Sequence, residues 1–330
     1  MIRNINKKIN YLKIKEISKI VLFVLYIYCL IFSNEIIFTK KLRESNLKVC
    51  VCTLGKDENK YIREFVEHYK NIGVDKIYLY DNNELDGERF ENIIGDYINN
   101  KFVDIINWRG VKGTSTYYRI MDSCYQEHYN KYDWLIFYEI DEFLYTKNYK
   151  NIKEYLTEEK FNECGTIQLN WVHMSDNNQI LYENKTLKER FPKIGKNVDK
   201  FKFNKICYIK TIIRGHLYNI NITHNHILSE NVKACDGFGR KSRVKGIISL
   251  YPDYKLNYIK HYYGKSVQEF IEKINRGDLL RGNEQKIVEW AIEKYFYINE
   301  ITPEKIKYIQ AKLGTKYNLT EYIKQLECKI

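Results

Sequence analysis

From residue 47 to residue 140, short apolar runs alternate with amphipathic stretches. The apolar runs are rich in β-branched and aromatic residues, which favour buried strands. The amphipathic stretches repeat apolar residues every three or four positions, as a helix with one buried face does. The predicted strands are Leu47–Thr53, Lys76–Tyr80, Phe102–Trp108 and Trp134–Ile140, and the predicted helices are Asn59–Asn71, Glu88–Ile98 and Thr114–His128. This alternation is typical of an α/β fold with a mostly parallel sheet and right-handed crossovers.

The pattern changes after residue 160. Further strands are predicted at Gly165–Val172, Cys207–Arg214 and Leu217–Thr223, and the chain is mainly helical from Ser266 onward. Neither an internal repeat nor a low-complexity linker divides it. We therefore expect an amino-terminal segment over 1–46, one catalytic domain over 47–282 and a helical extension over 283–330. The sequence also has no GxGxxG after the first strand and no GxxxxGK[ST], which counts against dinucleotide-binding and P-loop folds.

Two carboxylates, Glu139 and Asp141, follow the predicted strand Trp134–Ile140 at its end. In parallel sheets ligands bind beyond the carboxyl ends of the strands, where Thr53 and Asp81 also fall. Carboxylate oxygens at this spacing suit Mg²⁺ or Mn²⁺, which in turn can hold substrate phosphates. The alternative is a simple acidic turn after a strand, because short acidic motifs often arise by chance.

The charge of the chain does not indicate a nucleic-acid partner. The formal net charge is +12, but residues 1–46 hold nine Lys or Arg and only three Asp or Glu, so about half of the excess lies there. The rest is spread thinly, with neither a basic stripe nor a known nucleic-acid-binding module. We therefore exclude nucleic acid as the expected partner.

The 8 cysteines contain no CxxC pair and no zinc-like spacing with histidine. Cys50 and Cys52 alternate along a predicted core strand, where thiols usually behave as small buried hydrophobes. Disulfides among the other cysteines require an oxidising compartment, and their pairing cannot be derived from the sequence.

The amino terminus predicts a membrane anchor. Five lysines precede an uninterrupted apolar run from Ile20 to Phe32, and the stretch Ile17–Phe38 reaches the length of a span if Lys19 and Glu35 extend toward the interface. The positive flank predicts a cytoplasmic amino terminus with the body translocated, that is, a single-pass type II protein. A cleaved signal peptide and an amphipathic or buried helix are the alternatives. The compartment would be the Golgi in a eukaryote, or another membrane face in a bacterium or virus.

Several ordered motifs resemble glycosyltransferase family 92. They are Lys56–Tyr69, Gly73–Asp75, Tyr78–Asn83, Trp134–Phe143, Asn170-Trp171, Lys260–Tyr262, Lys265-Ser266 and Arg276-Gly277. The resemblance runs from about residue 47 to 282. Glu139 stands where the family's motif Asp-x-Asp-Glu-Phe has its first Asp, which puts direct metal ligation by this residue in doubt.

This resemblance implies a GT-A fold and transfer of a sugar from a nucleotide-sugar donor, with a UDP-sugar favoured, to a glycan or glycoconjugate acceptor. It implies Mn²⁺ or Mg²⁺ as cofactor, because the diphosphate leaving group must be neutralised. Asp141 is the first expected metal ligand and His261 the second, although a lone His is more often structural. Glu139 is expected at the ribose, or at the metal through water.

The resemblance also assigns donor-binding roles to Thr53, Glu58, Asp81 and Lys265. The plain alternatives are a favourable charge at a helix start for Glu58, a turn for Asp81 and a solvated surface side chain for Lys265. Family relatives of known stereochemistry invert, and an inverting transfer needs a general base near the anomeric carbon. His173 and Asp176, which follow the Asn170-Trp171 motif, are the candidates for this base.

Three other readings remain open. A nucleotidyl- or phosphotransferase would use similar metal chemistry but usually has a Gly-rich or basic phosphate loop. A catalytically inactive homologue would serve as a carbohydrate-binding or scaffold module, and the Glu139 substitution is the only hint toward it. A structural membrane protein would account for the first 40 residues but not for the ordered motifs.

Overall fold

The computed structural model describes residues 18–32, 46–113, 116–196, 207–217, 222–223, 226–227, 232–242, 244–245, 248–249, 254–255, 257–276 and 284–330. The chain divides into two compact units, Met1–Leu47 and Lys48–Ile330. In the first unit, residues 18–32 form a helix whose apolar side chains are exposed. Within the described ranges, no helix combines the length and apolar character needed to cross a membrane. The expected anchor segment, Ile17–Phe38, extends outside those ranges.

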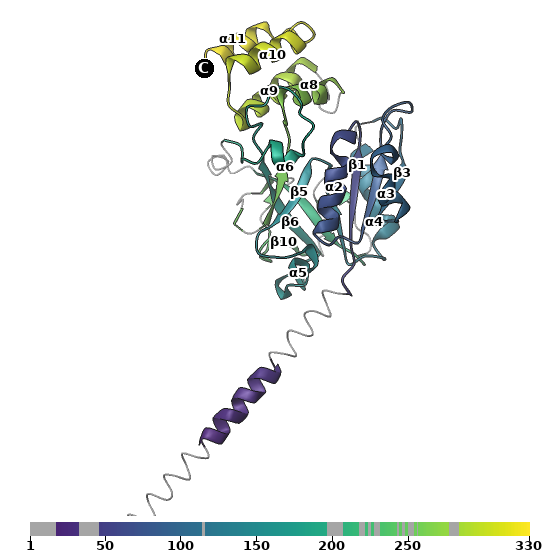
Figure 1. Ribbon diagram of the computed structural model, residues 1–330, viewed down its shortest axis with the longest axis vertical. Coiled ribbons are helices and arrows are strands. Elements are labelled where there is room, and N and C mark those ends of the chain that lie inside the picture. The colour runs from purple at the N-terminus through teal and green to yellow at the C-terminus, as the bar shows by residue number, and fades with distance from the viewer. Residues whose placement is uncertain are drawn as a thin grey trace, which may run out of the picture. The chain divides into compact units, whose positions relative to one another are not determined.

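The first half of the second unit has the predicted alternation of strands and helices. Its strands are β1 (Val49–Gly55), β2 (Lys76–Asp81), β3 (Val103–Asn107) and β4 (Trp134–Phe137), and its helices are α2 (Asn59–Asn71), α3 (Glu91–Asn99) and α4 (Thr116–His128). All seven residues of β1 but Leu54 are buried, as are all four of β4, which explains their continuous apolar sequence. Figure 1 shows the three helices around these strands.

The second half contributes mainly strands. They are β5 (Glu142–Thr146), β6 (Thr166–His173), β7 (Cys207–Arg214), β8 (Ile222–Thr223), β9 (His226–Ile227), β10 (Ala234–Asp236), β11 (Val244–Lys245), β12 (Ile248–Ser249) and β13 (Asn257–His261). Three short helices, α5 (Ile152–Leu156), η1 (Glu159–Phe161) and α6 (Leu187–Arg190), lie between them in the sequence. The predicted strand Leu217–Thr223 lies partly outside the described residues, and only its last two positions are seen as β8.

The main sheet has the strand order β3-β2-β1-β4-β7-β6-β13-β5. Strands β1 to β4 are parallel, whereas β7 is antiparallel to both β4 and β6, and β5 is antiparallel to β13. Because β7 lies between β4 and β6, β6 and its parallel neighbour β13 point the same way as β1 to β4. The sheet is therefore largely parallel, as predicted, and the carboxyl ends of β1, β2, β4, β6 and β13 share one edge.

Four helices follow the sheet: α8 (Val267–Asn275), α9 (Glu284–Ile298), α10 (Pro303–Leu313) and α11 (Thr320–Glu327). They gather at one end of the second unit (Figure 1), around a shared apolar core that includes Phe270, Ile292 and Leu313. Ser266 caps the start of α8 in a capping box with Glu269, which fixes where this helix begins. The carboxyl-terminal helices thus pack as one layer, to which α8 and α9 bring side chains of the site described below.

Two disulfides join distant segments, Cys52 with Cys124 and Cys164 with Cys235. The expectation of a buried free thiol is therefore wrong for Cys52, whereas Cys50 is buried and free. The reason is that α4 packs against β1 and places Cys124 opposite Cys52, with 6.3 Å between their Cα atoms. Strand periodicity shows which residues are buried but not which residue of another element they face.

Candidate active site

A cleft of about 510 Å³ opens at the carboxyl-terminal edge of the sheet. The cleft is lined by residues from the ends of strands β1, β4, β6 and β13 and from helices α4, α8 and α9. The lining residues are Leu54, Lys56, Glu58, Asn82, Gly113, Thr116, Tyr117, Tyr118, Glu139, Ile140, Asp141, Trp171, His261, Tyr263, Lys273, Arg276, Trp290 and Lys294. This is the place where open α/β sheets bind their ligands. The acidic motif after β4 therefore lies where the sequence predicted it.

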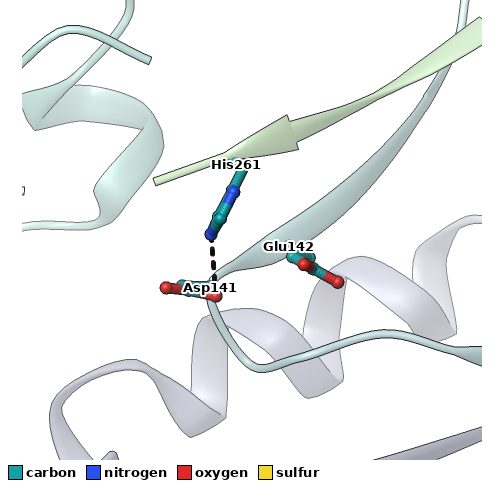
Figure 2. A group of neighbouring side chains, drawn as sticks. All are labelled: Asp141, Glu142 and His261. Atoms are coloured by element: carbon teal, nitrogen blue, oxygen red, sulfur yellow. Dashed lines mark ion pairs between the residues drawn. The ribbon is translucent and has the colours of Figure 1, made fainter. Parts of the chain in front are cut away.

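Asp141, Glu142 and His261 come together beside this cleft because of sheet register, and of the three only Asp141 and His261 line it. Glu142 begins β5 and His261 ends β13, and the two residues are direct antiparallel partners. One ligand atom from each of the three residues lies within 4.8 Å of the others, and all three are buried. Figure 2 shows His261 reaching from its strand toward Asp141, with 3.6 Å between Nε2 and Oδ1.

The chemistry of this group fits a divalent cation. Asp141 Oδ1, Glu142 Oε1 and His261 Nδ1 are buried atoms for which the described residues supply no hydrogen-bond partner. Ion pairs compensate two of these atoms in part, because Lys210 Nζ lies 3.4 Å from Glu142 Oε1 and His261 Nε2 lies 3.6 Å from Asp141 Oδ1. A bound cation would satisfy them in full. Burial lowers the pKa of His261 to about 4, which keeps the imidazole neutral and able to bind metal at neutral pH. Carboxylate oxygen and imidazole nitrogen together suit Mn²⁺ or Mg²⁺.

Two lysines flank Asp141. Its Oδ2 lies 3.0 Å from Nζ of Lys273, on α8, and 3.8 Å from Nζ of Lys265. Burial alone would raise the pKa of Asp141, but Lys273, His261 and Lys265 together outweigh it and hold this pKa well below its usual range. Lys265 has a φ of 53°, an uncommon left-handed backbone conformation for a lysine, and it is 6% exposed. The expectation of a solvated surface side chain does not apply to this residue.

Glu139 has a different environment from the other acidic residues of the motif. Its Oε1 accepts a 2.5 Å hydrogen bond from Lys210 Nζ, which also donates to Tyr117 at 2.9 Å. Although burial opposes ionisation, the charge of Lys210 lowers the pKa of Glu139 to about 2. Glu142, not Glu139, joins Asp141 and His261 in the compact group of possible metal ligands. The side chain of Glu139 is 36% exposed and lines the cleft, where it is accessible to a ligand.

Of the predicted donor-binding residues, Thr53, Glu58, Asp81 and Lys265 are buried, whereas Glu139 is partly exposed. Only one of the three at the ends of β1 and β2 lines the cleft. Glu58 does so, with Arg276 at 2.9 Å and Lys265 at 3.9 Å from its carboxylate. Asp81 pairs instead with Arg109 at 2.6 Å and accepts two hydrogen bonds from Asn83. Thr53 is fully buried, and neither it nor Asp81 is part of the cleft lining.

The two predicted bases differ in their surroundings. His173 is buried, with its ring centroid 5.0 Å from that of His261. Burial, followed by the effect of His261, holds its pKa well below the usual range. The carboxylate of Asp176 faces the carboxyl-terminal helices, where it accepts from Tyr295 at 2.7 Å and pairs with Lys305 at 2.6 Å. Neither His173 nor Asp176 is among the residues that line the cleft.

Three lysines of this site were not among the predicted residues: Lys210, Lys273 and Lys294. Lys210 lies on β7, and its apolar neighbours on that strand gave no sign that it would be charged and buried. Lys273 lies on α8 and is largely buried, and in the sequence its charged neighbours Glu272 and Arg276 made it look like one more surface lysine. Lys294 lies in the carboxyl-terminal extension, which carried no recognisable motif.

Among solved structures, that of S. aureus TarS 1-349 in complex with UDP-GlcNAc is 13% identical, covers 85% of this chain and 88% of its own, and has a TM-score of 0.34. The complex of the same protein with UDP is 11% identical, with the same coverage and a TM-score of 0.35.

Among curated proteins, a glycosyltransferase family 92 protein of Oryza sativa subsp. japonica is 26% identical over 125 residues, which cover 36% of this chain and 20% of that protein. One from Arabidopsis thaliana is 27% identical over 116 residues, which cover 34% of this chain and 19% of that protein. The chain thus matches only about a fifth of the length of these relatives. The profile of glycosyltransferase family 92 matches residues 45–313, beyond the stretch 47–282 that the motifs covered. This match confirms the resemblance of the motifs, and the chain belongs to glycosyltransferase family 92.

Proposed function

We propose that this chain is a metal-dependent glycosyltransferase with a GT-A fold. It moves a hexosyl group from a nucleotide-sugar donor, with a UDP-sugar favoured, to a glycan or glycoconjugate acceptor. The observation that carries this proposal is the group Asp141, Glu142 and His261 beside a cleft at the carboxyl ends of the strands. Membership of glycosyltransferase family 92 supports the class of reaction. The UDP and UDP-GlcNAc bound by TarS are consistent with a nucleotide-sugar donor.

The residues in and beside the cleft have different roles in donor binding. Asp141, His261 and Glu142 would hold Mn²⁺ or Mg²⁺, which when bound neutralises the charge of the diphosphate leaving group. Lys273 and Lys265 lie at 3.0 and 3.8 Å from Asp141, so their ammonium groups can pair with diphosphate oxygens next to that site. Glu139 is exposed to the cleft and held by Lys210, and it accepts from a ribose hydroxyl. Glu58 pairs with Arg276, which also lines the cleft, and so fixes the position of its guanidinium group.

The transfer proceeds with inversion, and His173 is the preferred general base. A base must accept the proton of the attacking acceptor hydroxyl, and the neutral imidazole of His173 has a nitrogen lone pair for it. Its lowered pKa makes it a weak base, so the bound acceptor would have to raise that pKa. Asp176 is less suited, because its carboxylate already pairs with Lys305 and Tyr295. His173 must be reached through the wall formed by His261 and Trp171, whose ring centroids lie 5.0 and 5.8 Å from its own.

We further propose that the chain is a single-pass type II membrane protein, anchored through the amino-terminal stretch Ile17–Phe38, with its catalytic unit in a Golgi lumen if the organism is eukaryotic. The lysines before the apolar run support this orientation. The two disulfides of the described residues support an oxidising compartment, because such bonds persist mainly there.

The proposal is tested by measuring nucleoside diphosphate release from a panel of nucleotide sugars by the full chain in detergent, with Mn²⁺ or with a chelator. Release from one donor that depends on Mn²⁺ is expected. Asp141→Asn should abolish this release, whereas Asp86→Asn, on an exposed residue outside the cleft lining, should leave it intact.

A catalytically inactive homologue that binds carbohydrate is the second candidate. The observation that favours it is Glu139, which replaces the first aspartate of the family motif and is engaged by Lys210. Donor binding without any release or transfer, in the presence of Mn²⁺ and a range of glycan acceptors, would assign the chain to this class.

A further inference from the structure

Lys294 is a cation in the cleft that is surrounded by aromatic rings. Its Nζ lies 4.0 Å from the ring centroid of Tyr263, and 5.3, 5.4 and 5.8 Å from those of Tyr208, Trp290 and Trp171. Aromatic faces attract an ammonium group, so these rings hold the lysine in place. They do not neutralise its charge.

Lys294 differs from the other cations of the cleft in its charge balance. Each of the others has a carboxylate within 4.0 Å; the pairs are Lys56–Glu84, Lys273–Asp141 and Arg276–Glu58. Among the residues that the structure describes, no carboxylate lies within this distance of Lys294. Burial, followed by repulsion from Lys273, lowers the pKa of Lys294 to about 8, although the more distant carboxylates of Glu139 and Asp141 act to raise it. A buried ammonium without a counter-ion is costly, and a bound anion would remove that cost.

Trp290 lies one helical turn before Lys294 and faces the same cleft. It is 48% exposed, in contrast to Trp134 and Trp171, which are 1% and 9% exposed. An indole that is half exposed on the wall of a polar cleft offers a flat apolar surface. The C–H face of a pyranose packs against such a surface, while the hydroxyls of the sugar remain available to polar groups.

We propose that α9 forms an acceptor subsite for a sugar that carries an anionic group, a carboxylate or a phosphate. Trp290 stacks on the pyranose ring, and Lys294 pairs with the anionic oxygens. The subsite deepens the proposed glycosyltransferase function and rests on it. The donor diphosphate is the other possible source of such oxygens. Lys273 and Lys265, next to Asp141, already serve that group, whereas Lys294 adjoins the exposed indole.

The test compares sugars that carry an anionic group with a neutral sugar. The full chain in detergent is titrated with methyl β-D-glucuronide, methyl β-D-glucoside and glucose 6-phosphate, and tryptophan emission is followed. The two anionic sugars should bind about tenfold more tightly than the glucoside, which is the effect expected of one charge-assisted contact. Lys294→Met should remove this preference, and Lys294→Arg should keep it. Lys286→Met, an equal charge change at an exposed residue of the same helix, should also keep it.

Trp290→Phe should reduce the emission change and weaken the binding of all three sugars. Equal binding of charged and neutral sugars to the unaltered chain would overturn the proposal, as would no binding of any of them. A parallel titration with UDP and Mn²⁺ separates the two sources of anionic oxygens. A fall of about tenfold in UDP affinity for Lys294→Met would assign Lys294 to the donor diphosphate and overturn the acceptor subsite. These binding measurements need no turnover, so they stand apart from a failure of the proposed enzymatic activity.

Discussion

The ammonium of Lys273 lies 3.0 Å from the carboxylate of Asp141, which is one of the three possible metal ligands. This contact has opposite consequences for two ligands. A positive charge beside Asp141 disfavours a divalent cation that binds alone, but it favours the diphosphate of a donor. The structure therefore predicts that metal and nucleotide bind more tightly together than separately.

Replacing Lys273 by Met should raise the affinity for Mn²⁺ alone and lower the affinity for UDP without metal. A change of about tenfold in each direction is expected for one charge at this distance in a partly screened site. Calorimetric titrations of the full chain would measure both values. Lys307→Met, on an exposed residue of α10, is the matched control and should change neither. A decrease in both affinities would show that Lys273 only maintains the shape of the site.

Replacing Lys210 by Met should strongly destabilise the protein. Lys210 is fully buried between Glu139 and Glu142, at 2.5 and 3.4 Å from their carboxylates. Its loss leaves the half-buried carboxylate of Glu139 and the buried carboxyl of Glu142, whose pKa burial already raises, without their charged partner. Breaking a buried pair in this way typically costs about 3–5 kcal/mol. Urea unfolding would measure the loss, and the added change Glu142→Gln should recover part of it. Lys233→Met, at an exposed ion pair with Glu163, should leave the unfolding midpoint unchanged.

The candidates for the general base can be separated by comparing stability with turnover. Asp176→Asn should cost stability, because Lys305 is fully buried and would lose its carboxylate partner, at about 3 kcal/mol. Its kcat, measured well below the unfolding temperature, should change little. His173→Gln should instead lower kcat by about a hundredfold or more. A hundredfold loss of kcat in a folded Asp176→Asn protein would transfer the role of base to Asp176.

Removing the disulfide between Cys52 and Cys124 should lower stability. The two residues are 72 positions apart, and cross-links over long loops typically contribute about 2–4 kcal/mol. Thermal unfolding of the double variant Cys52→Ala and Cys124→Ala should show a lower midpoint than the unaltered chain, and a reductant should abolish the difference. Cys328→Ala, on an exposed free cysteine, is the control. If the unfolding midpoint of the unaltered chain were the same with and without reductant, the bond would add no stability.

The agreement between sequence and structure is best where an element depends on its own residues. The helix Asn59–Asn71 was predicted with the bounds that it has, because its buried residues, among them Ile62, Phe65 and Tyr69, repeat at helical spacing. The strand after α4 ends earlier than predicted, at Phe137, because Tyr138 and Ile140 are buried without belonging to the ladder. Burial alone does not distinguish a strand from the loop that follows it.

The order and direction of the strands depend on contacts between distant segments. Strand β7 was predicted at its bounds, Cys207–Arg214, but its antiparallel position between β4 and β6 was not. Pairing of this kind follows from which surfaces are covered in the folded chain, and no local pattern records it. The insertion of β7 is also what brings Lys210 to Glu139.

Local patterns were thus sufficient to identify the α/β class and the family motifs, and the motifs led to the prediction of Asp141 and His261 as metal ligands. Only the tertiary structure determined which charged side chains are in contact with one another. Register placed Glu142 with Asp141 and His261, β7 engaged Glu139 through Lys210, and the carboxyl-terminal helices brought lysines to the cleft. The physical reason is that electrostatic partners act over a few ångströms in space, whereas the residues that form these contacts lie up to 132 positions apart in the sequence.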